Sequence, residues 1–250
     1  MLRPEAHSHP LAAILRQVGP ESCPGRFNFH CHTTCSDGSL QPHDLASQAM
    51  RLGLEHFAIT DHHSAWAYEG ARACLEAQAA EGEIVPQLWR GVEISALLEG
   101  CLVHVLALGF RSQAPSLTPY LQGQAVVGPA LRAEAVVAAI QAAGGLALLA
   151  HPARYRLPHR RLIAAADALG FDGAEAWYDY GMQGRWEPTP HVCTAIAADL
   201  EDRGLLQSCG TDTHGLELNG RKGLQTHSSQ PDGTVRSTAR KPRSRQRWPG

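Results

Sequence analysis

Short segments with β-strand character alternate with alanine-rich segments of helical character along most of this chain. The strand segments are expected at 26–32, 56–60, 87–95, 101–110, 146–152, 173–178 and 205–214. The helical segments are expected at 41–53, 66–82, 130–145, 160–170 and 191–204. Such alternation is typical of parallel strands joined by crossover helices, so it predicts an α/β fold. The short connection LLEG between the third and fourth strand segments predicts a hairpin there.

Histidine and acidic residues recur at the ends of the strand segments. The first segment carries His30 and His32, Asp61 and His62 follow the second, and His151 follows five apolar residues near the end of another. In closed β/α barrels the functional side chains gather at the C-terminal ends of the strands. This placement therefore favours a closed or nearly closed barrel over an open sheet.

The histidines are also unusually numerous. The chain has 14 of them in 250 residues, about twice the number expected from general amino-acid usage. Residues two apart in a strand point to the same face, so His30 and His32 would present two imidazoles to one ion while Cys31 points away. Asp37 follows in a Ser-Asp-Gly turn and could reach the same ion. A His-x-His pair alone is a weak signal, but its recurrence with other ligand types at later strand ends favours a metal site.

The type and number of candidate ligands indicate which metals the site would take. Mixed imidazole and carboxylate ligands suit manganese, iron or zinc better than calcium or magnesium. The candidates exceed what one ion can use, which predicts two or three divalent transition metal ions.

The last part of the chain differs from the rest in charge and pattern. From Gly220 onward eight Lys or Arg residues accompany one Asp, a net charge of +7, so the preceding residues carry −9 within the net −2 of the whole chain. Segment 222–250 has no apolar periodicity, and we expect a disordered basic tail that could contact anions such as RNA. The predicted organisation is an N-terminal extension at 1–25, one folded domain at 26–221 and this tail.

Cysteine usage and hydropathy bear on the compartment. Seven cysteines, scattered from Cys23 to Cys209, do not resemble a disulfide framework. A reducing cytoplasm is the simplest expectation. The sequence has no apolar run of about 18 residues, so we expect no membrane-spanning segment and no association with a membrane.

Five motifs in combination resemble one known family. HCHTTCSDGSL, ITDHHS, GVEIS, AHPARY and GTDTHG together resemble the polymerase and histidinol phosphatase (PHP) family over about residues 26–221. The resemblance implies a distorted (β/α)7 TIM-like barrel with a trinuclear metal centre at the C-terminal strand ends. Carried onto this chain, it implies nine metal ligands: His30, His32, Asp37, His62, Glu93, His104, His151, Asp212 and His214.

The resemblance also implies an activity. It is that of a metal-dependent phosphoric ester hydrolase, a phosphatase or phosphodiesterase, acting through a metal-bound hydroxide, with manganese favoured and zinc or iron as alternatives. AHPARY and ELNGRK look most like the branch that dephosphorylates nucleoside 3′,5′-bisphosphates and trims short RNA from its 5′ end. The expected substrate is thus a small phosphorylated metabolite, a nucleotide or a short oligonucleotide.

Two features depart from that branch. Only 46 residues separate His104 from His151, where the branch carries a helical insertion that caps the nucleotide. His63 stands where the branch has aspartate. Both departures concern the substrate and leave the metal ligands intact.

Three further residues are candidates for roles beside the metals. Arg154 could grip a phosphate by bidentate hydrogen bonds, with a surface arginine as the alternative. Asp61 could orient an imidazole. His63 could donate a proton to the leaving oxygen, with an exposed histidine as the alternative.

The aromatic residues Trp177, Tyr178, Tyr180 and Trp186 could stack a base, although ordinary packing is the stronger expectation for at least two of them. Two other functions stay open from the sequence. One is a hydrolase of another class on the same metal centre, and the other is a non-catalytic metal-binding PHP domain.

Overall fold

Seven strands in chain order form the frame of the protein. The computed structural model describes residues 6, 8–181 and 186–220. The strands are β1 (Phe27–Asn28), β2 (His56–Ile59), β3 (Gln87–Leu98), β4 (Cys101–Leu108), β5 (Leu146–Leu149), β6 (Gly173–Trp177) and β7 (Leu206–Cys209). Each strand pairs with the next along the chain, from β1 to β7. The predicted tail at 222–250 lies outside the described residues.

The first and last strands close the sheet into a ring. The amide of Phe29 donates to the carbonyl of Cys209 at 2.9 Å, and the amide of Asp212 donates to the carbonyl of His30 at 2.7 Å. Cys31 and Thr213 continue this pairing in parallel register beyond the regular strands. The expected seven-stranded, nearly closed barrel is confirmed, and its closure places the segments around residues 30 and 212 side by side.

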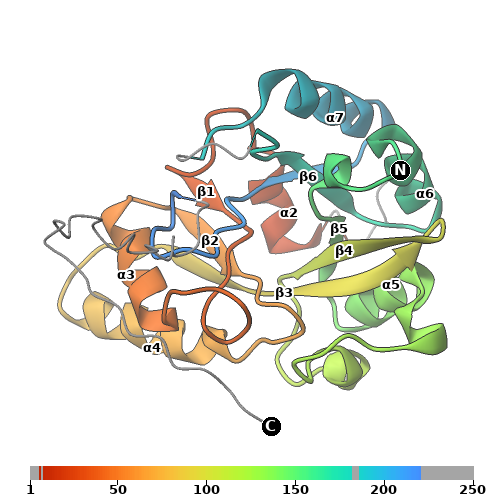
Figure 1. Ribbon diagram of the computed structural model, residues 1–250. Helices are drawn as coiled ribbons and strands as arrows, with labels where there is room; N and C mark the ends of the chain where they lie inside the picture. The colour runs from red at the N-terminus through yellow and green to blue at the C-terminus, as the bar shows by residue number, and fades with distance from the viewer. Residues whose placement is uncertain (1–5, 7, 182–185, 221–250) are drawn as a thin grey trace, which may run out of the picture.

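Helices surround the ring of strands. Figure 1 shows α3 and α4 together on one side of the barrel, and α5, α6 and α7 around the other. The helices are α2 (Pro10–Leu15), α3 (Pro42–Arg51), α4 (Ala67–Ala80), α5 (Ala133–Ala142), α6 (His159–Ala168) and α7 (Pro190–Arg203). Three short 3₁₀ turns accompany them, η1 (Pro115–Tyr120), η2 (Gly128–Leu131) and η3 (Pro152–Arg154). No helix within the described residues has the length and apolar content that crossing a bilayer requires.

The β3–β4 hairpin interrupts the parallel pattern. Strand β4 is antiparallel to both β3 and β5, whereas the other neighbouring pairs of strands are parallel. Since β4 runs backwards, His104 in its first half lies opposite Ser95, near the end of β3. The hairpin is confirmed. The expectation that site residues lie at strand ends is wrong for Glu93, which lies within β3. His104 lies within its strand, as the sequence indicates, and both residues reach the site because the hairpin extends past the rim.

The N-terminal extension packs against the barrel. In α2, Leu11, Ala12 and Leu15 are fully buried in the main core. His9 begins this helix, because its Nδ1 accepts the amide of Leu11 at 3.1 Å. Its Nε2 lies 3.1 Å from the carbonyl oxygen of Gly109, just after β4. Residues 8–15 are thus attached to the barrel core by both burial and hydrogen bonds.

Candidate metal centre

The segment after β1 delivers two imidazoles to the same place. His30 and His32 are fully buried with ring centroids 5.3 Å apart. Cys31 between them points away, and its thiol contacts the carbonyl of Ala58 at 3.2 Å. The regular part of β1 is shorter than the predicted strand, but extended pairing with the segment after β7 keeps the alternation of side chains that the sequence predicts.

Glu93 lies at the middle of the histidine cluster and is 1% exposed. Its Oε2 is 3.1 Å from His30 Nε2 and 3.2 Å from His32 Nε2. Its Oε1 is 2.9 Å from His104 Nδ1 and 3.2 Å from His151 Nε2. Oε2 also lies 3.5 Å from His62 Nδ1. The two carboxylate oxygens therefore face different groups of imidazoles, which is the arrangement of a carboxylate that can bridge two ions.

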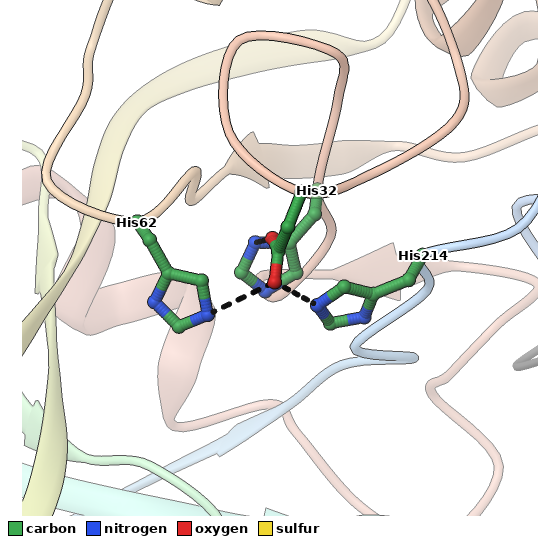
Figure 2. A group of neighbouring side chains, drawn as sticks. His32, His62 and His214 are labelled. Carbon is green, nitrogen blue, oxygen red and sulfur yellow. Dashed lines mark ion pairs between the residues drawn. The ribbon is translucent and has the colours of Figure 1, made fainter. Parts of the chain in front are cut away.

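A second group of ligands lies closer to the surface around Asp37. Figure 2 shows His32, His62 and His214 pointing toward one another. The carboxylate of Asp37 is 3.6 Å from His32 Nδ1, 3.8 Å from His62 Nε2 and 3.3 Å from His214 Nε2. The Asp37 side chain is 56% exposed, so this part of the centre is open to solvent.

Asp212 joins the buried part of the centre to the rim. Its Oδ1 is 3.4 Å from His30 Nε2 and 3.2 Å from His32 Nε2. Its Oδ2 accepts hydrogen bonds from the Tyr178 hydroxyl at 2.6 Å and the Arg154 guanidinium at 3.0 Å. One oxygen thus faces the imidazoles of the cluster while the other accepts two hydrogen bonds at the rim.

The structure brings all nine predicted ligands together in overlapping groups. They fall into the sets His32, Asp37, His62 and His214; His30, His32, Glu93 and Asp212; and His62, Glu93 and His104, with His151 beside Glu93. Two atoms that each lie about 2.0–2.2 Å from one ion are about 3.0–3.5 Å apart. Most of the carboxylate–imidazole separations above fall in this range.

Unsatisfied ring nitrogens give a second test of the fit to metals. Both nitrogens of His32 are buried and make no hydrogen bond, and the same holds for Nδ1 of His104. A buried polar atom without a partner is costly. The nitrogens face carboxylate oxygens at contact distance but without hydrogen-bond geometry, so the residues fit ions placed between them.

The charges of the cluster shift the pKa values of its histidines in opposite directions. Burial opposes protonation of His32, but Asp212 and Glu93 outweigh it and raise its pKa to about 9. For His62, burial dominates and lowers the pKa to about 4. An imidazole must lose its proton before it binds a metal, so metal binding at His32 is coupled to proton release.

Asp61 is fully buried below the Asp37 turn. Its Oδ1 accepts the amide of Thr33 at 2.7 Å and the hydroxyl of Ser36 at 2.7 Å, and its Oδ2 accepts the hydroxyl of Thr33 at 2.6 Å. These partners belong to the turn that carries Asp37. Among the described residues, the side-chain hydrogen bonds of Asp61 go to this turn and not to an imidazole.

The other two candidates lie at the edge of the centre. Arg154 is held by Asp212 and by the Tyr178 hydroxyl at 2.8 Å, yet its side chain is 41% exposed. His63 is buried, and its Nε2 accepts the amide of Ser95 at 3.3 Å and lies 3.1 Å from the hydroxyl of Ser95. His63 lies outside the three ligand sets found in the described part of the chain.

One residue of the centre has no sequence prediction. Glu175 in β6 is fully buried, and both its carboxylate oxygens lie 3.2 Å from His30 Nδ1. Its Oε2 also accepts the amide of His151 at 2.9 Å. Glu175 therefore favours a proton on Nδ1 of His30, while Nε2 faces Glu93 and Asp212 inside the cluster. A lone acidic residue inside the apolar segment GAEAW was the available signal.

Three residues of the centre adopt the left-handed backbone region. His63 has φ 51°, His151 has φ 26° and Asp212 has φ 50°. Such conformations cost about 1–3 kcal/mol each in a residue other than glycine and persist where the surroundings impose them. Here the chain turns sharply just beyond β2, β5 and β7, and each turn aims a side chain at or beside the cluster.

The aromatic residues expected near the mouth are mostly packed. Tyr178 is fully buried, Trp186 is 4% exposed and Trp177 is 9% exposed. Trp177 also donates its indole N–H to the side chain of Gln207 at 3.1 Å. The expectation of ordinary packing for at least two of them is confirmed.

Comparison with known proteins identifies relatives of this arrangement. A family model described as PHP domain matches residues 28–154, half of the chain. A 5′-3′ exoribonuclease from Haemophilus influenzae is 35% identical over 99 residues, which cover 40% of this chain and 34% of that protein. A 3′,5′-nucleoside bisphosphate phosphatase from Chromobacterium violaceum is 28% identical over 200 residues, covering 80% of this chain and 58% of that protein. The chain therefore spans only part of the length of these relatives.

Solved structures share the fold. A protein from Bifidobacterium adolescentis described as a metal-dependent phosphoesterase has a TM-score of 0.63 at 22% identity, with 81% of this chain and 92% of that chain covered. A protein from Chromobacterium violaceum named an amidohydrolase, with bound sulfate and no metal, has a TM-score of 0.64 at 21% identity, with 80% and 92% covered. At this identity the likeness concerns the fold alone.

Proposed function

Because the chain belongs to the PHP domain family, we propose that it is a metal-dependent phosphoesterase that hydrolyses a phosphate ester of a small metabolite, nucleotide or short oligonucleotide. The observation that carries the proposal is the position of Glu93, whose two oxygens face different groups of imidazoles. A carboxylate in this position suits a centre of more than one ion, and such centres are common in phosphoryl hydrolysis.

The proposed ligands are the nine residues brought together at the barrel rim. Three are carboxylates and six are imidazoles, so the neutral-imidazole form of the set carries three negative charges that divalent cations would balance. This donor set supports two or three divalent transition metal ions, with manganese favoured and zinc or iron as alternatives. Bound there, the ions would activate water and stabilise charge on the phosphoryl oxygens.

The protein's own side chains would position the ester. Arg154 is fixed at one end by Asp212 and Tyr178 while much of its guanidinium stays exposed, which suits it to bind a phosphoryl oxygen. Asp61 would act through the turn that presents Asp37. For His63, burial and its contacts with Ser95 support a role in holding the rim loop, with proton donation as the alternative to be tested.

The names of the relatives support a nucleotide or oligonucleotide as substrate, since they are an exoribonuclease and a nucleoside bisphosphate phosphatase. The segment 109–132 between β4 and α5 contains only the 3₁₀ turns η1 and η2. It would leave the mouth more open than a helical cap, which suits substrates of more than one size. We place the activity in the cytoplasm, where the seven free cysteines would stay reduced.

A substrate panel tests the proposal. The protein purified with Mn²⁺ is offered a nucleoside 3′,5′-bisphosphate, p-nitrophenyl phosphate and a 5′-phosphorylated short RNA, and phosphate or nucleotide release is measured together with metal content. We expect at least two metal ions per chain and hydrolysis of at least one ester. His30→Ala should abolish the activity, whereas His43→Ala, a change at an exposed position on α3, should leave it intact.

Well under one metal ion per chain would contradict the proposal. Metal-loaded protein that releases no phosphate or nucleotide from the whole panel would favour the other open functions, a hydrolase of another class or a non-catalytic metal-binding domain. Full activity of the His30→Ala protein would show that the proposed centre is not the active site.

A further inference from the structure

The exposed apolar side chains of this protein gather at one end of the barrel. Within the described residues, six large apolar side chains are well exposed. Five of them form what we term the apolar rim: Trp66, Leu97, Leu102, Val127 and Leu216. Single exposed apolar residues are ordinary, but a group of them in one region marks a binding surface.

Chain topology places the apolar rim at the end that holds the metal centre. Trp66, 69% exposed, follows His62 by four residues in the loop after β2, and Leu216 follows His214 by two. The sixth side chain, Ile84, precedes β3 and lies at the opposite end of the barrel. The exposed apolar surface therefore surrounds the site instead of being spread over the molecule.

Two further contacts bring Val127 to the same end. The amide of Gly123 donates to the carbonyl of His63 at 2.9 Å. Arg132 forms a bridge with Leu97 near the tip of the hairpin. Both flanks of Val127 are thus attached to the rim of the metal centre.

The β3–β4 hairpin gives the clearest geometry (Figure 1). Leu97 and Leu102 are directly paired across the two strands, and Ser95 and His104 form the pair below them. Side chains alternate along a strand, so Leu97 lies on the same face as Glu93, and Leu102 on the same face as His104. The opposite face, which includes Ala96 and Val103, is fully buried.

The ligand-bearing face of the hairpin thus becomes exposed and apolar toward its tip. Glu93 is 1% exposed, whereas Leu97 is 41% and Leu102 is 57% exposed. Two residues of strand separate His104 from Leu102, about 7 Å. A group joined through a sugar to a phosphate at the metal centre reaches this distance.

The loop that carries Trp66 is attached to the same face. His63 accepts the amide of Ser95, which lies between Glu93 and Leu97 on that face. Trp66 is three residues beyond His63, so the Cα atoms of the two residues lie at most about 11 Å apart. The segments that carry Trp66 and the Leu97–Leu102 pair are thus linked to each other through His63 and Ser95.

We propose that Trp66, Leu97 and Leu102 bind the base of a nucleotide substrate, so that the enzyme distinguishes nucleotides from other phosphate esters by apolar contact with the base. This inference rests on the proposed phosphoesterase function and names its substrate class. A base has an apolar face that stacks on aromatic and aliphatic side chains without regard to its hydrogen-bonding edge. Preference among the four bases is accordingly small.

The test compares binding of a nucleoside 5′-monophosphate with binding of ribose 5-phosphate, which lacks the base. Calorimetry is carried out on the Mn²⁺-loaded wild-type protein, on Trp66→Ala and on the double variant L97S/L102S. All three positions are exposed, so the variants should fold, and circular dichroism checks this. Ile84→Ser, at an equally exposed apolar position on the far end, is the matched control.

We expect each variant to raise the Kd of the nucleotide by roughly tenfold, while the Kd of ribose 5-phosphate stays unchanged. The control should match wild type for both ligands. Equal affinity of wild-type protein for the two ligands would overturn the inference even if both are hydrolysed. Unchanged nucleotide affinity in both variants would also overturn the inference. If the variants changed only the oligomeric state, the apolar rim would be assigned to a contact between proteins.

Failure of the proposed function has a different signature. Base-dependent binding that is lost in the variants, in a protein that hydrolyses no phosphate ester, would keep the base contact and remove the enzymatic proposal. Hydrolysis of a phosphate ester without base-dependent binding would keep the enzymatic proposal and remove the base contact.

Discussion

Replacing Glu175 by glutamine should weaken metal binding although this side chain touches no proposed site for an ion. Glu175 is fully buried and accepts from two donors, the Nδ1 of His30 and the amide of His151. Glutamine has one oxygen for these two donors, and its NH₂ group would face the other. Loss of such an orienting partner typically costs 10–100-fold in metal affinity, about 1.4–2.8 kcal/mol. We expect a value within this range, because the glutamine oxygen can still accept from one donor while its NH₂ group opposes the other.

Competition with a chromophoric chelator measures the affinity directly and does not depend on catalysis. Asp172→Asn is the matched control, since Asp172 is also fully buried and accepts a backbone amide, that of Ala147, but away from the centre. The control should lower the free energy of unfolding and leave metal affinity unchanged. Wild-type metal affinity in Glu175→Gln would refute the inference that this carboxylate fixes the orientation of His30.

Four other outcomes are expected. Arg154→Ala should raise KM for a phosphate ester by about tenfold or more, because a charge-assisted hydrogen bond to the phosphoryl group is lost; steady-state kinetics measures this. Asp61→Asn should reduce the metal content by about one ion per chain through the Asp37 turn, measured by elemental analysis. Gly210→Ala should lower the free energy of unfolding by about 1–3 kcal/mol, seen in denaturant titration, since a Cβ there would lie 2.7 Å from the backbone nitrogen of His30. Metal removal by chelation should lower Tm, and Mn²⁺ at a hundredfold excess over Kd should restore about 2.7 kcal/mol.

Periodicity and spacing predicted that histidine and acidic side chains would meet at one end of the barrel, and the resemblance supplied the full set of proposed ligands. His30 and His32 share a face because the extended pairing of that segment preserves the two-residue repeat. For the same reason the Cys31 side chain points away from the metal centre. Glu93 and His104 were assigned by resemblance, and the hairpin that brings them together was predicted from one short turn. His104 was expected within its strand, but the continuation of β3 to Leu98 was missed, because the sequence does not reveal how far a hairpin extends past the rim.

The supporting residues were harder to find because their partners are distant in sequence. Glu175 contacts His30 from β6, which is separated from β1 by β7 alone in the closed ring but is about 145 residues away in sequence. A single acidic residue in an apolar segment does not reveal which donors its carboxylate accepts from. Asp61 was expected beside an imidazole but holds Thr33 and Ser36. Both contacts depend on strand register and closure of the ring, which local patterns do not encode.

Closure of the barrel between its first and last strands has a consequence for biosynthesis. A nascent chain that has reached His151 already contains seven of the nine proposed ligands, but Asp212 and His214 come only after β7. Before β7 docks beside β1, the outer group lacks His214 and the buried group lacks Asp212. If the nine residues bind metal as proposed, the full set of ligands forms only after β7 has been made and docked, and a ribosome-stalled chain ending before Asp212 should hold metal more loosely than the finished protein.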